Sequence, residues 1–113
     1  MAKLEDLRAF GANVDEGLQR CVNNEDFYLK MIQKAIGDNS FEDLEKTIEE
    51  KDLDQAFEIA HALKGVLANL SLTPLCEPVS EIVELLRNRT DTDYSSYIEK
   101  IKVKKAELEN LIG

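Results

Sequence analysis

The single histidine of the chain, His61, lies in a strongly helical stretch and is the leading candidate for a nucleophile. A helical wheel at about 100° per residue places an apolar arc on one side of this stretch and His61 nearly opposite the centre of the arc. The arc consists of Ala56, Ile59, Ala60, Leu63, Leu67 and Leu70. The imidazole is therefore expected to face solvent, where a neutral ring nitrogen is a good nucleophile near neutral pH.

Other side chains on the same helix face would surround the imidazole. Residues three, four and seven positions away share a face in a helix. The residues that meet this condition on either side of the histidine are Asp54, Phe57, Glu58, Lys64, Gly65 and Ala68. The pattern predicts a small exposed patch with one nucleophile.

This stretch resembles the histidine-containing phosphotransfer domain, or HPt domain, whose hallmark is a helical His-x-x-Lys-Gly. The chain reads Ala60-His61-Ala62-Leu63-Lys64-Gly65, and the similarity continues through Ala68-Asn69-Leu70 and Leu75-Cys76. The short motif alone would match many proteins by chance, whereas the extended match on the expected helix face is much more specific. The resemblance implies that His61 accepts a phosphoryl group from a receiver-domain aspartate and returns it to the aspartate of another receiver. The chain would then be a relay and not an ATP-dependent kinase.

The resemblance also implies partners and roles. Response-regulator receiver domains would be the partners, with a hybrid histidine kinase as a further candidate. The magnesium would belong to the receiver, and the chain would need no cofactor of its own. An ammonium at Lys64 would offset phosphoryl charge. Gly65 would leave room for the partner, because a glycine inside a helix costs about 1 kcal/mol relative to alanine and needs a reason. The docking surface would comprise Asp54, Phe57, Glu58 and Ala68.

Plainer interpretations stand beside these roles. Lys64 could simply solvate the helix or pair with Glu58. Gly65 could permit close helix packing, although it lies away from the apolar arc, and Phe57 borders that arc and could belong partly to the core. The alternative function is a helical protein-binding module that docks on receiver or kinase domains without phosphotransfer. A hydrolase is disfavoured because no acid–base pair accompanies the histidine.

Capping signals and helical spacing predict helices along the whole chain. A short leading helix would end near Gly11, and further helices would begin at caps on Asn13, Asn24, Ser40 and Asp52. The helix that starts at Asp52 carries the histidine and would end at about residue 70.

The second half of the chain continues the pattern. Thr73 and Pro74 predict a cap and a proline at the first helical position, but Pro78 should delay the regular helix until near Glu77. Ser71 stands where HPt domains usually have a glycine for a left-handed helix exit. A long helix should run from Tyr94 to the end of the chain. Short connections favour an all-α, up-and-down antiparallel four-helix bundle with one or two short N-terminal helices.

Composition limits the classes of function. The 113 residues, 43% hydrophobic and 33% charged, suit a single domain over residues 1–113. A net charge of −9, from 23 acidic and 14 basic residues, disfavours nucleic acid and anionic membranes as partners. No apolar run reaches the roughly 18 residues of a spanning helix, and the first residues lack a signal peptide's apolar core. We therefore expect a cytoplasmic monomer.

Two further expectations concern the cysteines and the ends of the chain. Cys21 and Cys76 are predicted to be buried free thiols, and with one histidine they offer too few ligands for a zinc site. No metal is therefore expected. The start methionine and the little spare sequence favour a stand-alone HPt protein, although a domain cut from a hybrid sensor kinase would look the same.

Overall fold

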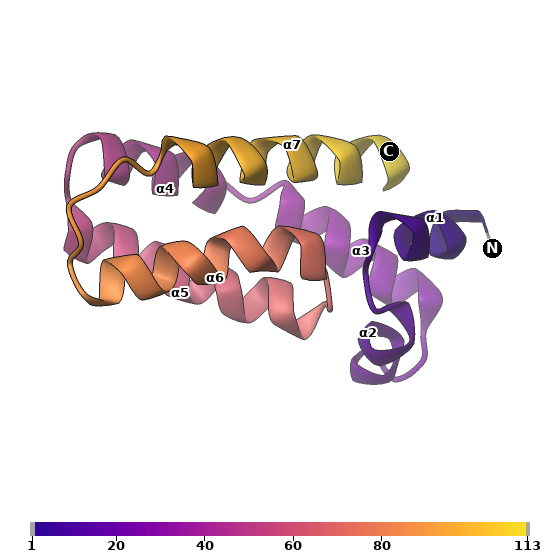
Figure 1. Cartoon of the computed structure of the whole chain (residues 1–113). Helices are drawn as coiled ribbons and strands as arrows, with labels where there is room; N and C mark the ends of the chain where they lie inside the picture. Colours follow the sequence, from indigo (N-terminus) through magenta and orange to yellow (C-terminus); the bar gives the residue numbers. More distant parts are fainter. Residues whose placement is uncertain (1, 113) are drawn as a thin grey trace.

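The computed structural model describes residues 2–112, and these residues form seven α-helices without a strand among them (Figure 1). Two short helices come first, α1 (Ala2–Phe10) and α2 (Val14–Arg20). The five longer helices are α3 (Glu25–Ile36), α4 (Ser40–Glu49), α5 (Leu53–Asn69), α6 (Thr73–Arg87) and α7 (Ser95–Ile112). The predicted all-α class is confirmed.

Helices α4 to α7 run up and down as antiparallel neighbours (Figure 1). Helix α5 packs against α4 on one side and α6 on the other, and α6 packs against α7. An ion pair of 2.7 Å between Lys102 Nζ and Glu45 Oε2 joins α7 to α4 and closes the bundle. Helix α3 precedes α4 in the same direction, so these two helices follow one another along one side of the bundle, while α1 and α2 lie at the far end (Figure 1).

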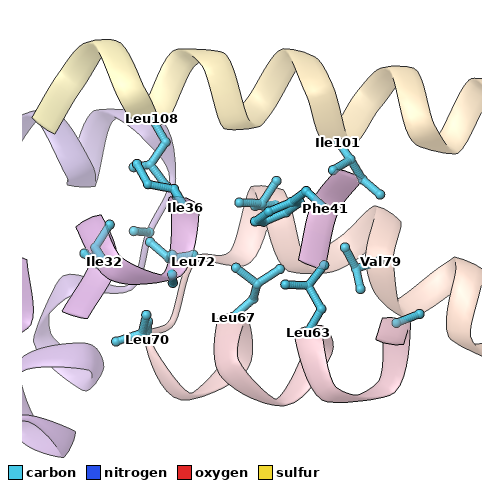
Figure 2. Close-up of a cluster of buried hydrophobic side chains, with 14 of the residues drawn as sticks. Ile32, Ile36, Phe41, Leu63, Leu67, Leu70, Leu72, Val79, Ile101 and Leu108 are labelled. Atoms are coloured by element: carbon cyan, nitrogen blue, oxygen red, sulfur yellow. The ribbon is translucent and has the colours of Figure 1, made fainter. Parts of the chain in front are cut away.

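The apolar arc predicted around the histidine is the part of α5 that enters the core. Ala56, Ala60, Leu63 and Leu67 are buried, and Ile59 is partly buried. Figure 2 shows their neighbours converging from α3, α4, α6 and α7, including side chains such as Ile36, Phe41, Val79 and Ile101. With one face of α5 held in this way, the opposite face carries its side chains into solvent.

Side-chain caps mark the start of α2, α3 and α5. The side-chain oxygens of Asn13, Asn24 and Asp52 accept hydrogen bonds from the backbone N–H groups three residues later, as predicted. Ser40 is not a cap, contrary to expectation. It is the first residue of α4, and its own N–H donates to Asp38 Oδ1 at 3.0 Å. The carboxylate of Asp38 therefore serves the start of this helix as a hydrogen-bond acceptor.

Helix α6 begins earlier than predicted. Thr73 lies inside the helix, and Leu72 takes the cap position, where its carbonyl accepts from the N–H groups of Leu75 and Cys76 at 3.1 and 2.9 Å. Pro78 lies within the helix and does not delay it. The absent N–H of a proline in the second turn leaves only a carbonyl of the first turn without a partner, and the ring is buried in the core. The loss is small enough for the helix to continue.

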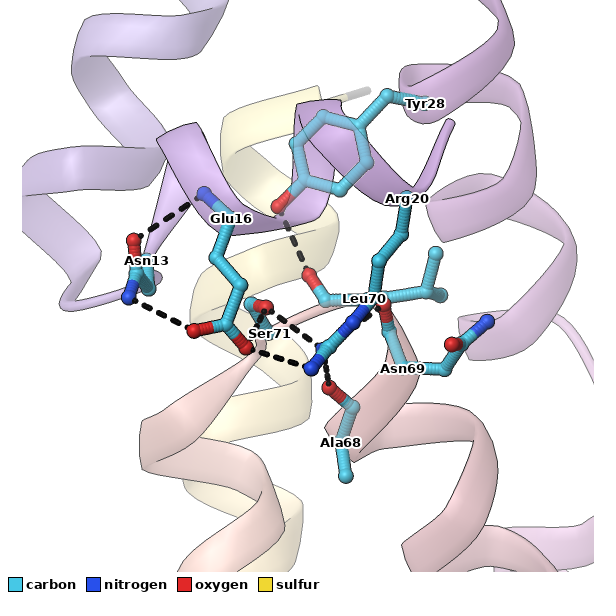
Figure 3. Close-up of polar contacts among 8 residues, drawn as sticks. All are labelled: Asn13, Glu16, Arg20, Tyr28, Ala68, Asn69, Leu70 and Ser71. Atoms are coloured by element: carbon cyan, nitrogen blue, oxygen red, sulfur yellow. Dashed lines mark hydrogen bonds and ion pairs between the residues drawn. The ribbon is translucent and has the colours of Figure 1, made fainter. Parts of the chain in front are cut away.

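The end of α5 is held by residues from α2 and α3 (Figure 3). Ser71 is buried and adopts a φ of 58°, the left-handed conformation expected at this position although the residue is not glycine. Its hydroxyl donates to Glu16 Oε1 at 3.2 Å and accepts from Arg20 Nη1 at 3.3 Å. Arg20 Nη1 also donates to the carbonyl of Ala68 at 2.7 Å. These bonds offset the strain that a glycine would have avoided.

Tyr28 of α3 makes the second connection to this helix end. Its hydroxyl donates to the Leu70 carbonyl at 2.8 Å, and its side chain is fully buried. Burial, with a smaller effect from Cys21, raises the pKa of Tyr28 to about 12. Gly17 of α2 packs so closely that a Cβ there would lie 2.6 Å from the Tyr28 hydroxyl. The C-terminal end of the histidine helix is therefore fixed by groups from two other helices.

The candidate histidine site

His61 lies in the middle of α5 with its side chain exposed, as predicted. Its imidazole contacts the ring of Phe57, one turn earlier, with 5.6 Å between ring centroids and a tilt of 31°. No hydrogen bond or ion pair within residues 2–112 engages the imidazole. A ring nitrogen can therefore reach a reactant that approaches from solvent.

Lys64 lies one turn beyond the histidine and is half-buried. Its backbone carbonyl is 3.9 Å from Cys76 Sγ of α6, which places this part of α5 against the neighbouring helix. Within the described residues its ammonium forms no ion pair, so the alternative pairing with Glu58 is not formed. The ammonium is available to an incoming anion.

Gly65 faces open space. A Cβ built at this position would meet nothing within 4 Å. Close helix packing therefore does not explain the glycine, and that alternative is wrong. The absence of a side chain beside the imidazole leaves room for another molecule to approach the ring.

Two arginines that the sequence analysis did not identify complete the patch. Arg87 Cζ lies 5.3 Å and Arg89 Cζ 5.6 Å from the centroid of the Phe57 ring, within the range of cation–π interactions. Arg89 Nε also pairs with Asp54 Oδ1 at 2.6 Å. The patch thus extends from α5 to the end of α6 and the turn that follows.

A sequence signal for these arginines existed. The turn between α5 and α6 is short, so the helices form an antiparallel hairpin in which residues at equal distances from the turn are neighbours. Counting outward from Ser71, the positions near Asp54 and Phe57 on α5 are opposite Arg87 and Arg89 on the other side. Pairing of the two helices, and not the motif itself, would have revealed them.

The other predicted contact residues fall at the borders of the patch. Glu58 is exposed on α5. Ala68 is exposed near the end of the helix, where its carbonyl already accepts from Arg20. Of the predicted contact residues, Phe57 contacts the imidazole directly, and Asp54 is linked to it only through Arg89 and Phe57. Glu58 and Ala68 share only its helix.

The two cysteines are both free thiols and differ in burial. Cys21 is a buried free thiol as predicted, whereas Cys76 is only partly buried. Within residues 2–112, no three histidine, cysteine, aspartate or glutamate side chains are grouped as a metal site would require. No helix in this part of the chain has the length and apolar character to cross a lipid bilayer.

The fold and the site define a helical bundle that presents one exposed histidine in the middle of a helix. The family model described as "Hpt domain" matches residues 28–112, and the chain belongs to this family. No curated protein and no solved structure gives a significant match. Hpt domains carry phosphoryl groups on histidine in phosphorelays, interact with receiver domains and are carriers rather than kinases.

Proposed function

We propose that His61 accepts a phosphoryl group from an aspartate of a receiver domain and passes it to the aspartate of another receiver. The observation that carries the proposal is an exposed imidazole with unoccupied ring nitrogens beside open space at Gly65. The exposed ring allows in-line approach, and the transfer exchanges one P–O bond for one P–N bond. The donor carboxylate leaves with the electron pair of the broken bond.

Lys64 acts on the charge that the transfer creates. The transferring group carries negative charge on three equatorial oxygens, and an ammonium one turn from the imidazole stabilises that charge. Because Lys64 has no competing ion pair within residues 2–112, it can turn toward the phosphoryl group without first breaking a contact. In this proposal the magnesium ion and the acidic residues that bind it belong to the receiver.

The receiver docks over the face of α5 that surrounds the histidine. Gly65 permits close approach, and the exposed or partly exposed residues on either side supply contacts. The proposed contact residues are Asp54, Phe57, Glu58 and Ala68. We expect the complex to be transient, because a carrier must release one partner before it meets the next.

The test is phosphoryl transfer from a panel of phosphorylated receiver domains to the wild-type protein, to His61→Gln and to Lys64→Ala. We expect acid-labile labelling of the wild type that a second receiver can remove, no labelling of His61→Gln, and slower labelling of Lys64→Ala. Circular dichroism would establish that the variants are folded.

One result would favour the alternative function. If receivers bind the wild-type protein and none labels it, the chain is a protein-binding module and the proposed transfer is wrong. Binding of the same receivers to His61→Gln with equal affinity would strengthen that conclusion, because the histidine would then contribute nothing to recognition.

A further inference from the structure

The imidazole of His61 rests on a small stack of planar groups. Its ring contacts Phe57, and the guanidinium groups of Arg87 and Arg89 lie over the same phenyl ring. The three partners come from α5, from the last residue of α6 and from the turn after α6. Phe57 is partly buried against the core, so one part of its ring is held by the bundle and the part beside the histidine faces the two guanidinium groups.

Arg89 is held firmly in this stack. Its Nη1 donates to the Leu86 carbonyl at 2.6 Å, and its Nε pairs with Asp54 at 2.6 Å. Its backbone has a φ of 52°, a left-handed conformation that a non-glycine residue adopts only where its surroundings compensate. Contacts at two nitrogens of the guanidinium therefore fix where this group lies.

Arg87 is held more loosely and acts on the same ring. Its Nε is 3.6 Å from Glu84 Oε1 on its own helix, and its side chain is half-exposed. Its planar guanidinium can stack on an aromatic face, which an ammonium does less well. Together the two arginines confine the phenyl ring between the ends of two helices.

We propose that Arg87 and Arg89 are positioning residues that act on His61 through Phe57. The guanidinium groups hold the phenyl ring, and the ring holds the imidazole in the orientation from which its nitrogen attacks phosphorus. The effect on phosphoryl transfer rests on the proposed function. The ordering of the His61 imidazole is a property of the free protein and does not depend on that function. Both guanidinium groups lie over the Phe57 ring, and this ring contacts the imidazole, so the proposed action of both arginines is indirect.

The expected size of the effect follows from side-chain freedom. An unrestrained histidine on a helix samples about two χ1 wells and two broad χ2 orientations, so about four arrangements share the population. Loss of the phenyl support would reduce the reactive fraction by at most about fourfold. We expect removal of both guanidinium groups to slow phosphorylation of His61 by about two- to fourfold.

The first experiment avoids any protein partner. Phosphoramidate can phosphorylate an imidazole directly, forming the P–N bond as ammonia leaves. Rates would be compared for the wild type, for Arg87→Gln with Arg89→Gln, and for Arg87→Lys with Arg89→Lys. The variant Lys30→Gln with Lys34→Gln removes two exposed cations of α3 and is the charge-matched control.

The three variants separate positioning from charge. If the arginines position the ring, the glutamine variant is slowed, the lysine variant is restored only in part, and the α3 control matches the wild type. If the lysine variant recovers the full rate, charge alone accounts for the effect and the inference is overturned. An unchanged rate in the glutamine variant overturns it as well.

The second experiment reads the ring without phosphorylation. Because the chain has one histidine, a ¹³C-labelled imidazole gives resonances that need no assignment. We expect their order parameters to fall in the glutamine variant and to stay unchanged in the α3 control. If order is unaffected, the inference is wrong even where receivers label the protein. If order falls but no receiver labels the wild type, the proposed function fails and the positioning of the ring stands.

Discussion

Replacing Tyr28 with phenylalanine removes the hydroxyl that connects α3 to the end of α5. At neutral pH the variant loses a buried hydrogen bond of 2.8 Å and leaves the Leu70 carbonyl without that donor. A loss of this kind costs about 1–2 kcal/mol of unfolding free energy. Urea unfolding at pH 7, followed by circular dichroism, should show the wild type more stable by this amount.

The difference in unfolding free energy between the wild type and Tyr28→Phe should also depend on pH. Burial raises the pKa of Tyr28 from 10.0 to about 12, so the folded chain holds the phenolic proton more tightly than the unfolded chain does. The resulting stability is complete below pH 10 and is lost as pH rises through 12. At pH 11 the loss is about 1.4 kcal/mol. The advantage of the wild type over Tyr28→Phe should therefore nearly vanish at pH 11.

The control is Tyr97→Phe, because the Tyr97 hydroxyl of α7 makes no hydrogen bond within residues 2–112. Its difference from the wild type should stay within about 0.5 kcal/mol at both pH values. A difference between the wild type and Tyr28→Phe that is the same at pH 7 and pH 11 would refute the reasoning, because it would mean that the buried phenol does not titrate as the structure requires.

Three further predictions concern the same helix and its supports. Gly65→Ala should raise the unfolding free energy by up to about 1 kcal/mol, since its Cβ meets open space, and thermal unfolding measures this gain. The same variant should slow phosphoryl transfer from receivers, which labelling rates measure. Gly17→Ala places a Cβ 2.6 Å from the Tyr28 ring and should cost about 1–3 kcal/mol in urea unfolding, and an unchanged midpoint would contradict the packing. Arg20→Ala removes the donor to the Ala68 carbonyl and should cost about 1 kcal/mol, with faster amide exchange confined to the end of α5 as the specific sign.

Sequence patterns predicted the structural features that depend on residues close together in the sequence. The apolar arc of α5 and the caps at Asn13, Asn24 and Asp52 follow from spacing along one helix, and each was found where expected. The exposure of His61 follows from the same arc, because a residue opposite the buried face of a helix points into solvent.

Features that depend on other helices could not be predicted in this way. Arg87 and Arg89 reach Phe57 only because α6 folds back along α5, and nothing in the motif contains that information. The local effect of Pro78 predicts a delayed start of α6 near Glu77, but burial of its ring in the core and its place near the helix start outweigh the lost bond. Ser71 accepts a conformation suited to glycine because residues of α2, distant in sequence, bind its hydroxyl.

Because α2 contacts the end of α5, the part of the chain that folds together begins before the first residue that the family model matches. The family model begins at residue 28, whereas Glu16 and Arg20 lie before it and complete the helix that carries the histidine. A protein shortened to residues 28–112 would keep every residue of the histidine motif and the Tyr28 donor, but it would lose Arg20 and Glu16, which bind Ala68 and Ser71 at the end of the helix. Fraying there would start two turns from the imidazole. The structural unit that holds the histidine helix in this chain is therefore larger than the segment that the family model covers.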